Sequence, residues 1–253
     1  GMFTACGTFF AFSGFMKPAY LMSSLIRLPV KYVWSHDAFR VGEDGPTHQP
    51  IEQEAQVRLM EHVKNHKGKN SMLVLRPADV HETTVAWKMA MENLDTPTGL
   101  ILSRQNINDL PCEKGNNYEQ ALGAEKGAYI VKDCKGTPDI IMVASGSEVS
   151  TLFEGAKLLE DRKNLNIRIV SAPSEGLFRS QSKEYQTEVL PNNIPTYGMT
   201  AGLSLNIRDL VGANGFVHGL NHFGYSAPYK VLDEKFGFNG ESVYNEVCEY
   251  LNI

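Results

Sequence analysis

Short apolar runs alternate with longer amphipathic stretches along the first hundred residues. The runs are rich in Val, Ile and Leu, and their length predicts buried strands at 28–34, 71–75 and 99–102. Apolar residues spaced by three and four predict helices among them, at 18–26, 51–63 and 81–93. Because strands and helices alternate, the pattern predicts a parallel sheet with right-handed helical crossovers.

The same rhythm returns after residue 127. The predicted strands are 128–131, 139–144, 167–171 and 196–199, and the predicted helices run from 148 to about 159 and over 203–211, 229–235 and 242–251. The stretch 106–126 is polar, contains Gly and Pro, and is typical of a linker. We therefore predict an α/β fold with two consecutive three-layer domains and mainly parallel sheets, divided as 1–105, linker 106–126, and 127–253.

The composition limits the partners of the chain. Its 253 residues include 24 Lys or Arg and 29 Asp or Glu, and the net charge of −5 argues against nucleic acid or an anionic membrane as the main partner. No apolar run reaches the roughly 20 residues that cross a bilayer. The four cysteines form no C-x-x-C pair and no secretory signal is recognisable, so we expect separate thiols in the cytoplasm.

The densest polar cluster follows the predicted strand 28–34. It contains His36 and Asp37, then Asp44 and His48 within GEDGPTHQP. Ligands bind outside the carboxyl ends of strands in parallel sheets, and histidines exchange protons near neutral pH. The cluster therefore indicates a binding or catalytic site. A solvated turn, or a metal site of His36, Asp44 and His48, remain as alternatives.

Arg104 follows the predicted strand 99–102. Its guanidinium would hold a phosphate or carboxylate at the same edge of the sheet, or else cap the strand end or pair with Asp109. The turn 145–148 would bind an anion on its backbone or, as we favour, supply Ser145 or Ser147 as a helix cap.

Four phenylalanines lie close together near the start. Read as a half-buried strand, this run places Phe10 and Phe12 on one face and Phe9 and Phe15 on the other. These rings would pack in the core or stack a flat heterocycle.

Taken in order, several segments resemble the transketolase family, whose members depend on thiamine diphosphate. The first block contains GTFFAFSGF, LPVKYVWSHD, GEDGPTHQPIE, MLVLRPAD and LILSRQ, and the second contains PDIIMVASGSEV, SAPSEGLF, VLPNNIP and HFGYSAP. SHD and SRQ fit transketolases better than the related decarboxylating synthase of isoprenoid precursors, which has a GPTH-like loop. The resemblance covers almost the whole chain.

The resemblance implies a pyrimidine-binding domain followed by the family's C-terminal domain. It implies an enzyme of the pentose phosphate pathway that transfers a two-carbon ketol unit from a ketose phosphate to an aldose phosphate. Thiamine diphosphate would carry the carbanion chemistry, while the protein orients the reactants and moves protons.

The matched motifs also imply roles for single residues. Phe9, Phe12 and Phe15 resemble the aromatic pocket around the aminopyrimidine ring, with Phe15 where relatives often have Tyr. His48 resembles a histidine that transfers protons beside the substrate. Asp44 resembles the carboxylate that hydrogen-bonds a hydroxyl of the donor sugar.

His36 and Arg104 complete this set, because they resemble the residues that hold the sugar phosphate. No metal ligand is expected among the matched positions. Magnesium or calcium would belong to the diphosphate-binding domain of the family, whose Gly-Asp-Gly motif does not occur in this sequence.

The glutamate that activates the cofactor in relatives lies upstream of the aromatic run and also has no counterpart. The resemblance therefore implies an N-terminally truncated pyrimidine domain that is inactive alone. Its expected partners are a diphosphate-binding section or subunit, sugar phosphates and a second copy in a homodimer. A non-catalytic assembly module, or another thiamine diphosphate-dependent ketol or acyl transferase, remain as alternatives.

Overall fold

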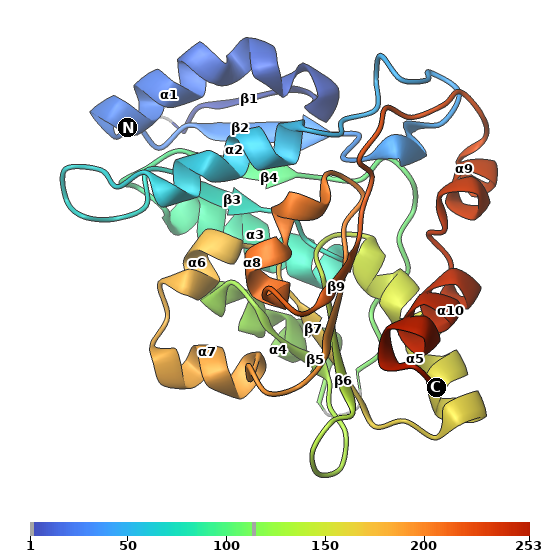
Figure 1. The fold of residues 1–253 in the computed structure, drawn as a ribbon. Coiled ribbons are helices and arrows are strands. Elements are labelled where there is room, and N and C mark those ends of the chain that lie inside the picture. The colour runs from blue at the N-terminus through green and yellow to red at the C-terminus, as the bar shows by residue number, and fades with distance from the viewer. Residues whose placement is uncertain (1–2, 113–114) are drawn as a thin grey trace.

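The first unit of the structure, from β1 to β4, is built on a four-stranded parallel sheet (Figure 1). The computed structural model describes residues 3–112 and 115–253. The strands lie in the order β1-β2-β4-β3 and are β1 (Ala5–Phe9), β2 (Lys31–Ser35), β3 (Leu73–Leu75) and β4 (Thr98–Ile101). The helices are η1 (Phe10–Met16), α1 (Lys17–Ile26), η2 (Phe39–Val41), α2 (Gln53–His62) and α3 (Val80–Glu92).

Helices cover both faces of this sheet. On one face, Tyr32 and Trp34 of β2 share a buried cluster with Val57 of α2. On the other face, Leu100 of β4 is buried with Ala86 of α3. The first unit therefore has the three layers that the alternating pattern predicts.

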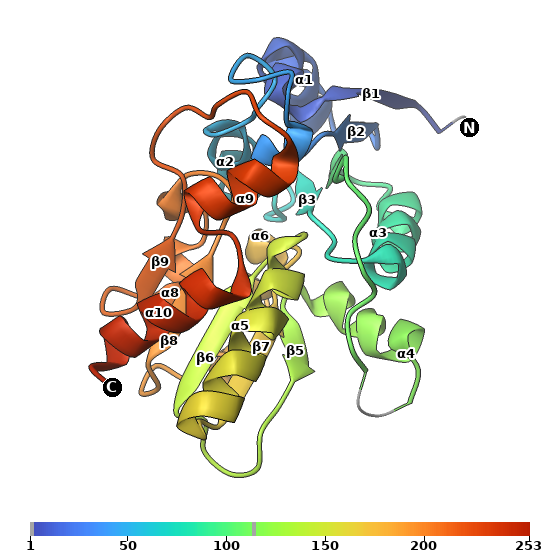
Figure 2. The same ribbon diagram turned by 90° about the vertical axis from the view of Figure 1, so that its right-hand side faces the viewer.

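The second unit, from β5 to α10, is built on a five-stranded sheet in the order β5-β7-β6-β8-β9. Its strands are β5 (Tyr129–Lys132), β6 (Ile140–Ala144), β7 (Ile167–Ser171), β8 (Thr196–Met199) and β9 (Phe216–His218). Only β5 runs antiparallel to its neighbour, β7, among these described strands. The helices are α5 (Glu148–Lys163), α6 (Glu175–Arg179), α7 (Lys183–Val189), η4 (Ser204–Asn206), α8 (Arg208–Val211), α9 (Tyr229–Phe236) and α10 (Gly240–Leu251). Figure 2 shows α5 lying across β6 and β7, with α10 beside it.

The α/β fold class with mainly parallel sheets is confirmed, with local differences. The predicted linker contains two short helices, α4 (Asn117–Ala121) and η3 (Leu122–Lys126), which pack against α3. Asn116 caps α4 by accepting a 2.9 Å hydrogen bond from the amide of Glu119. The predicted helix 203–211 is divided into η4 and α8.

The reading of the aromatic run as a strand is wrong. The strand β1 ends at Phe9, and residues 10–16 form a 3₁₀ helix. Because residues three apart lie on one face of a 3₁₀ helix, Phe9, Phe12 and Phe15 share a side. Phe10 turns inward instead and packs 5.7 Å from Trp34, measured between ring centroids.

The two units share a continuous buried core. Phe39 of the first unit is fully buried, and its ring centroid lies 5.1 Å from that of Phe236 and 4.8 Å from that of Phe238 in the second unit. The two sheets are therefore held as neighbouring parts of one body, seen above and below each other in Figure 1.

In the described part of the chain, no helix combines the length and apolar character needed to cross a membrane.

Glu82, in the first turn of α3, is a second contact between the units. One carboxylate oxygen accepts a 2.8 Å hydrogen bond from the hydroxyl of Tyr129 in β5, and the other accepts one of 2.8 Å from the amide of Ala78. Burial raises the pKa of Glu82 from 4.5 to about 7, although these hydrogen bonds oppose the shift.

This raised pKa predicts a pH-dependent stability. The folded chain retains a proton that the unfolded chain loses above pH 4.5, so the free energy of unfolding falls as the pH rises towards about 7. Relative to wild type, Glu82→Gln should gain about 2 kcal/mol of stability between about pH 5.5 and about pH 8. Urea unfolding at both pH values measures this gain. The exposed Glu249→Gln is the control, and an equal pH dependence in both variants would contradict the assignment to Glu82.

Candidate active site

The predicted site residues follow the carboxyl ends of three parallel strands. Phe9 ends β1 and pairs in register with Ser35, which ends β2 and precedes His36. Arg104 follows β4, the next strand in the sheet. Since the strands are parallel, these ends meet at one edge, where ligands bind in folds of this kind.

The three spaced phenylalanines form an aromatic row at this edge. The ring centroids of Phe9 and Phe12 are 6.2 Å apart with planes within 11°, and those of Phe12 and Phe15 are 6.4 Å apart. Phe15 is 86% exposed, whereas Phe9 and Phe12 are half-buried. The row therefore presents aromatic surface outward from the edge of the sheet.

His36 lies directly on this row. Its ring stacks on Phe9, with centroids 3.6 Å apart and planes 20° apart, and its Nδ1 lies 2.9 Å from the hydroxyl of Ser35. Burial lowers the pKa of His36, and the positive charge of Arg104 lowers it further, while Asp44 opposes the shift. The imidazole is therefore held neutral at neutral pH.

His48 meets the row from the glycine-rich loop. Its ring stands edge-on to Phe12, with centroids 5.2 Å apart and planes at 77°, and its Nδ1 lies 2.9 Å from the hydroxyl of Thr47. The loop needs left-handed backbone at Gly42 (φ 86°) and Gly45 (φ 76°), which glycine adopts without strain. Gln49 ties the loop to the second unit, because its Nε2 donates a 2.9 Å hydrogen bond to the carbonyl of Tyr225.

Asp44 and Arg104 complete the group at the solvent-facing side. Both are exposed, and both act on His36 through their charges. Asp109, the alternative partner for Arg104, lies 3.7 Å from Nε2 of His81 instead. The structure thus brings the sequence-predicted histidines, charges and phenylalanines to one edge of the first sheet.

The metal alternative finds no support. Across residues 3–112 and 115–253, no group of three or more His, Cys, Asp and Glu side chains is arranged to hold a metal ion. Of the two predicted caps, Ser147 occupies the N-cap position of α5, but its hydroxyl makes no capping hydrogen bond to the helix. It bonds to the side chains of Arg40 and Glu148 instead.

Sequence reasoning missed a buried ion network directly behind the site. Asp37, Arg76 and Glu148 form its centre, and Arg40 connects Glu148 to Asp233. Two of these residues could have been recognised from the sequence, because Arg76 and Glu148 each follow a strongly apolar predicted strand. A charge placed there is buried at the carboxyl edge and needs a partner.

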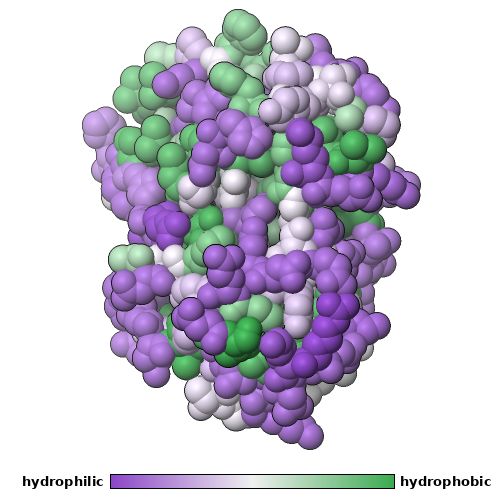
Figure 3. Space-filling view, turned by 45° about the vertical axis from the view of Figure 1, so that its right-hand side comes forward, coloured by the Kyte–Doolittle hydropathy of each residue, from purple (hydrophilic) through white to green (hydrophobic). Residues whose placement is uncertain are grey.

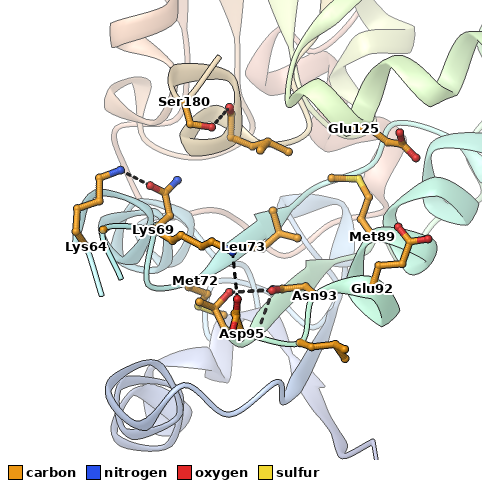
Figure 4. A pocket seen from close by; sticks show the side chains of 15 residues that line it. Lys64, Lys69, Met72, Leu73, Met89, Glu92, Asn93, Asp95, Glu125 and Ser180 are labelled. Atoms are coloured by element: carbon orange, nitrogen blue, oxygen red, sulfur yellow. Dashed lines mark hydrogen bonds and ion pairs between the residues drawn. The ribbon is translucent and has the colours of Figure 1, made fainter. Parts of the chain in front are cut away.

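A cavity of about 670 Å³ lies at the opposite end of the first sheet (Figure 4). Met72 and Leu73, at the amino end of β3, form part of its wall, and Glu125 and Ser180 line it from elsewhere in the chain. Lys69 and Asp95, both at its rim, form an ion pair of 3.1 Å. This cavity contains none of the predicted site residues, so it is separate from the aromatic edge.

Comparison with known proteins identifies the family. The model "Transketolase, pyrimidine binding domain" matches residues 1–109, and the model "Transketolase-like TK C-terminal domain" matches residues 127–239. The transketolase of Bacillus subtilis is 41% identical over 248 residues, which are 97% of this chain and 35% of that protein. The structure resembles transketolase from Leishmania mexicana with a TM-score of 0.86 and 36% identity, over 99% of this chain and 34% of the other.

A third comparison concerns the fold alone. A structure described as "Split gene transketolase, inactive beta4 tetramer" matches with a TM-score of 0.71 at 22% identity, over 98% of this chain and 76% of the other. Together, fold and matches define an α/β protein whose first unit is a pyrimidine-binding domain. The chain belongs to the transketolase family, and it spans about a third of the length of the curated relatives it matches.

Proposed function

We propose that the chain is the section of a transketolase that holds the pyrimidine end of thiamine diphosphate and the sugar substrates. The complete enzyme would transfer a two-carbon ketol unit from a ketose phosphate to an aldose phosphate. The observation that carries this proposal is the convergence of motif-matched residues on one edge, where His36 and His48 both contact the aromatic row.

The aromatic row fits the cofactor's pyrimidine end. Phe12 and Phe15 present ring surface on which a flat heterocycle stacks. When bound, thiamine diphosphate supplies the carbanion chemistry of the reaction. The diphosphate and its metal need ligands from another section, because the described residues offer no cluster suited to a metal ion.

The two histidines and the charged side chains beside them bind the sugar substrates. His48 exchanges a proton with the reacting substrate, since its ring stands beside Phe12 and its Nδ1 is oriented by Thr47. Asp44 accepts a hydrogen bond from a sugar hydroxyl. Arg104 and neutral His36 hold the phosphate, the arginine through charge and the imidazole through a hydrogen bond.

The partner we propose is the diphosphate-binding section of the enzyme, in a homodimeric or heteromeric assembly. Helix α1 supports such a contact, because four of its apolar side chains are about half exposed: Leu21, Met22, Leu25 and Ile26. Figure 3 shows apolar surface at the top of the molecule, over the first unit. Apolar patches of this kind commonly mark protein interfaces.

We also propose the division 1–105, 106–126 and 127–253 and a cytoplasmic location, where phosphorylated sugars are metabolised. The separate sheets and the two family models support this division.

An assay of reconstituted activity tests the proposal. The 253-residue chain alone, with thiamine diphosphate and magnesium, should show no ketol transfer between pentose phosphates. Adding the part of the Bacillus subtilis transketolase that lies N-terminal to the matched region should restore turnover. Turnover by the chain alone would overturn the proposed dependence on a second section.

Calorimetry distinguishes the enzyme from a non-catalytic assembly module. Tight binding of the N-terminal section without turnover would favour the module. Binding accompanied by turnover favours the enzyme, and the acceptor that is consumed separates a transketolase from another ketol or acyl transferase.

A further inference from the structure

The buried ion network behind the site begins one residue after His36. The side chains of Asp37 and Arg76 are 2% and 1% exposed, and they form an ion pair of 2.7 Å. One carboxylate oxygen of Asp37 accepts hydrogen bonds from Nε and Nη2 of Arg76, at 3.1 and 2.7 Å. The other oxygen is buried without a partner among the described residues, so Arg76 alone anchors this side chain.

The second unit holds Arg76 in place. Nη1 of Arg76 donates to the carbonyl of Ser145 at 2.8 Å and also pairs with the carboxylate of Glu148. The backbone of Arg76 is bound on both sides, because its amide donates to the carbonyl of Pro173 at 2.9 Å and its carbonyl accepts from the amide of Gly146 at 3.1 Å.

Glu148 is itself fixed from a second direction. Its other oxygen accepts from Nη1 of Arg40 at 3.1 Å, and Nε of Arg40 donates to Asp233 at 2.6 Å. Although burial opposes ionisation, the charge of Arg76 keeps the pKa of Glu148 below its usual value. Glu148 therefore stays charged, and its position, fixed by Arg40, in turn fixes the guanidinium of Arg76.

His36 is the residue that this arrangement would hold. Its φ of 62° is left-handed, a conformation that costs a non-glycine residue about 1–2 kcal/mol and persists only where neighbours impose it. Ser35 is set on one side by its pairing with Phe9 in the sheet. On the other side of His36, the side chain of Asp37 is fixed by its ion pair with Arg76. His36 lies between these two fixed neighbours, and its imidazole stacks on Phe9.

We propose that Arg76 and Glu148 are positioning residues, through which the second unit holds the left-handed backbone at His36 and keeps its ring stacked on Phe9. The C-terminal domain thereby shapes a site that lies in the other domain. The consequence for sugar binding rests on the proposed function, whereas the placement of the ring does not.

Proton NMR of the histidine rings tests the placement in the 253-residue chain, without cofactor or sugar. Stacking on Phe9 shifts the His36 ring signals upfield by ring current, and the variant His36→Gln assigns them by their loss. In Glu148→Gln, these signals should move downfield, towards those of the exposed His66. Unchanged His36 signals would overturn the proposal.

Glu61→Gln is the matched control. Glu61 is buried, as Glu148 is, and it also joins the units, through a 3.0 Å hydrogen bond from Ser174. A 3.1 Å ion pair links it to Arg58 within α2. The variant Glu61→Gln should leave the His36 signals in place. An equal shift in this variant would show a general loosening of the structure, which would overturn the proposal. If Glu148→Gln does not fold, Glu148→Asp decides by the same criterion, since it withdraws the carboxylate from Arg76 but keeps the charge.

The assembled enzyme gives a second readout. Glu148→Gln should raise the KM for phosphorylated sugars more than it lowers kcat, because His36 would no longer be held where the phosphate binds. An unchanged KM in an active assembly contradicts the positioning role. An inactive wild-type assembly contradicts the proposed function instead, and the NMR result still decides the placement of His36.

Discussion

Replacing His48 with glutamine in the assembled enzyme is expected to lower kcat for ketol transfer by about 10²- to 10⁴-fold, the usual contribution of a positioned acid or base. The ring of His48 stands edge-on to Phe12, and its Nδ1 is bound to Thr47, so Nε2 is left to exchange a proton with the substrate. Glutamine keeps the polarity of the side chain but cannot take up a proton near neutral pH.

Steady-state kinetics of the reconstituted enzyme measures this loss. His66→Gln, on an exposed loop, is the control and should keep full activity. A loss of less than about tenfold in His48→Gln would show that His48 does not transfer a proton in the rate-limiting step.

Replacing Arg76 with methionine is expected to lower the free energy of unfolding by about 3–5 kcal/mol, because it leaves buried charges without their partner. Asp37 and Glu148 both bind this guanidinium, and all three side chains are at most 2% exposed. Methionine has a similar length, so the loss would reflect charge rather than a cavity. The variant should also remain folded over a narrower range of pH than wild type.

Urea unfolding monitored by circular dichroism measures this stability. The control is Arg162→Met, which removes an ion pair with Glu241 between α5 and α10 on the exposed surface. It should leave the unfolding midpoint nearly unchanged, because surface ion pairs contribute little. Equal midpoints for the two variants would contradict a structural role for the buried network.

The buried strands of the core could be predicted from sequence because they are continuous apolar runs. β6, for example, is buried along its whole length, and its boundaries differ by one residue from the prediction. β1 was missed because it lies at the edge of the sheet, has no fully buried residue and contains Gly7. A Cβ at Gly7 would approach the carbonyl of Val33 to 2.5 Å, so this glycine is required by close strand packing rather than by a turn.

The place of the candidate site at the edge of the first sheet could be predicted from the sequence, but its geometry only in part. Motifs carry residue identity, so they pointed to His36, His48 and Arg104, all at the edge found in the structure. The shared face of Phe9 and Phe12 was not predicted, because it depends on whether the chain continues as a strand or turns into a 3₁₀ helix.

The buried network could not be predicted from spacing. Arg76 and Glu148 are 72 residues apart and Arg40 and Asp233 are 193 residues apart, so no local pattern connects them. Their pairing is a property of how the two units pack. Sequence therefore located the candidate site, and the structure was needed to show the buried ion network behind it.

Titration of the N-terminal section of Bacillus subtilis transketolase with this chain tests the central claim most directly. With thiamine diphosphate, magnesium and a ketose phosphate donor present, ketol transfer should rise with added chain and saturate at one chain per N-terminal section. Turnover that stays at the level of the separate parts, although calorimetry shows that they bind, would contradict the claim that this chain supplies the substrate side of the active site.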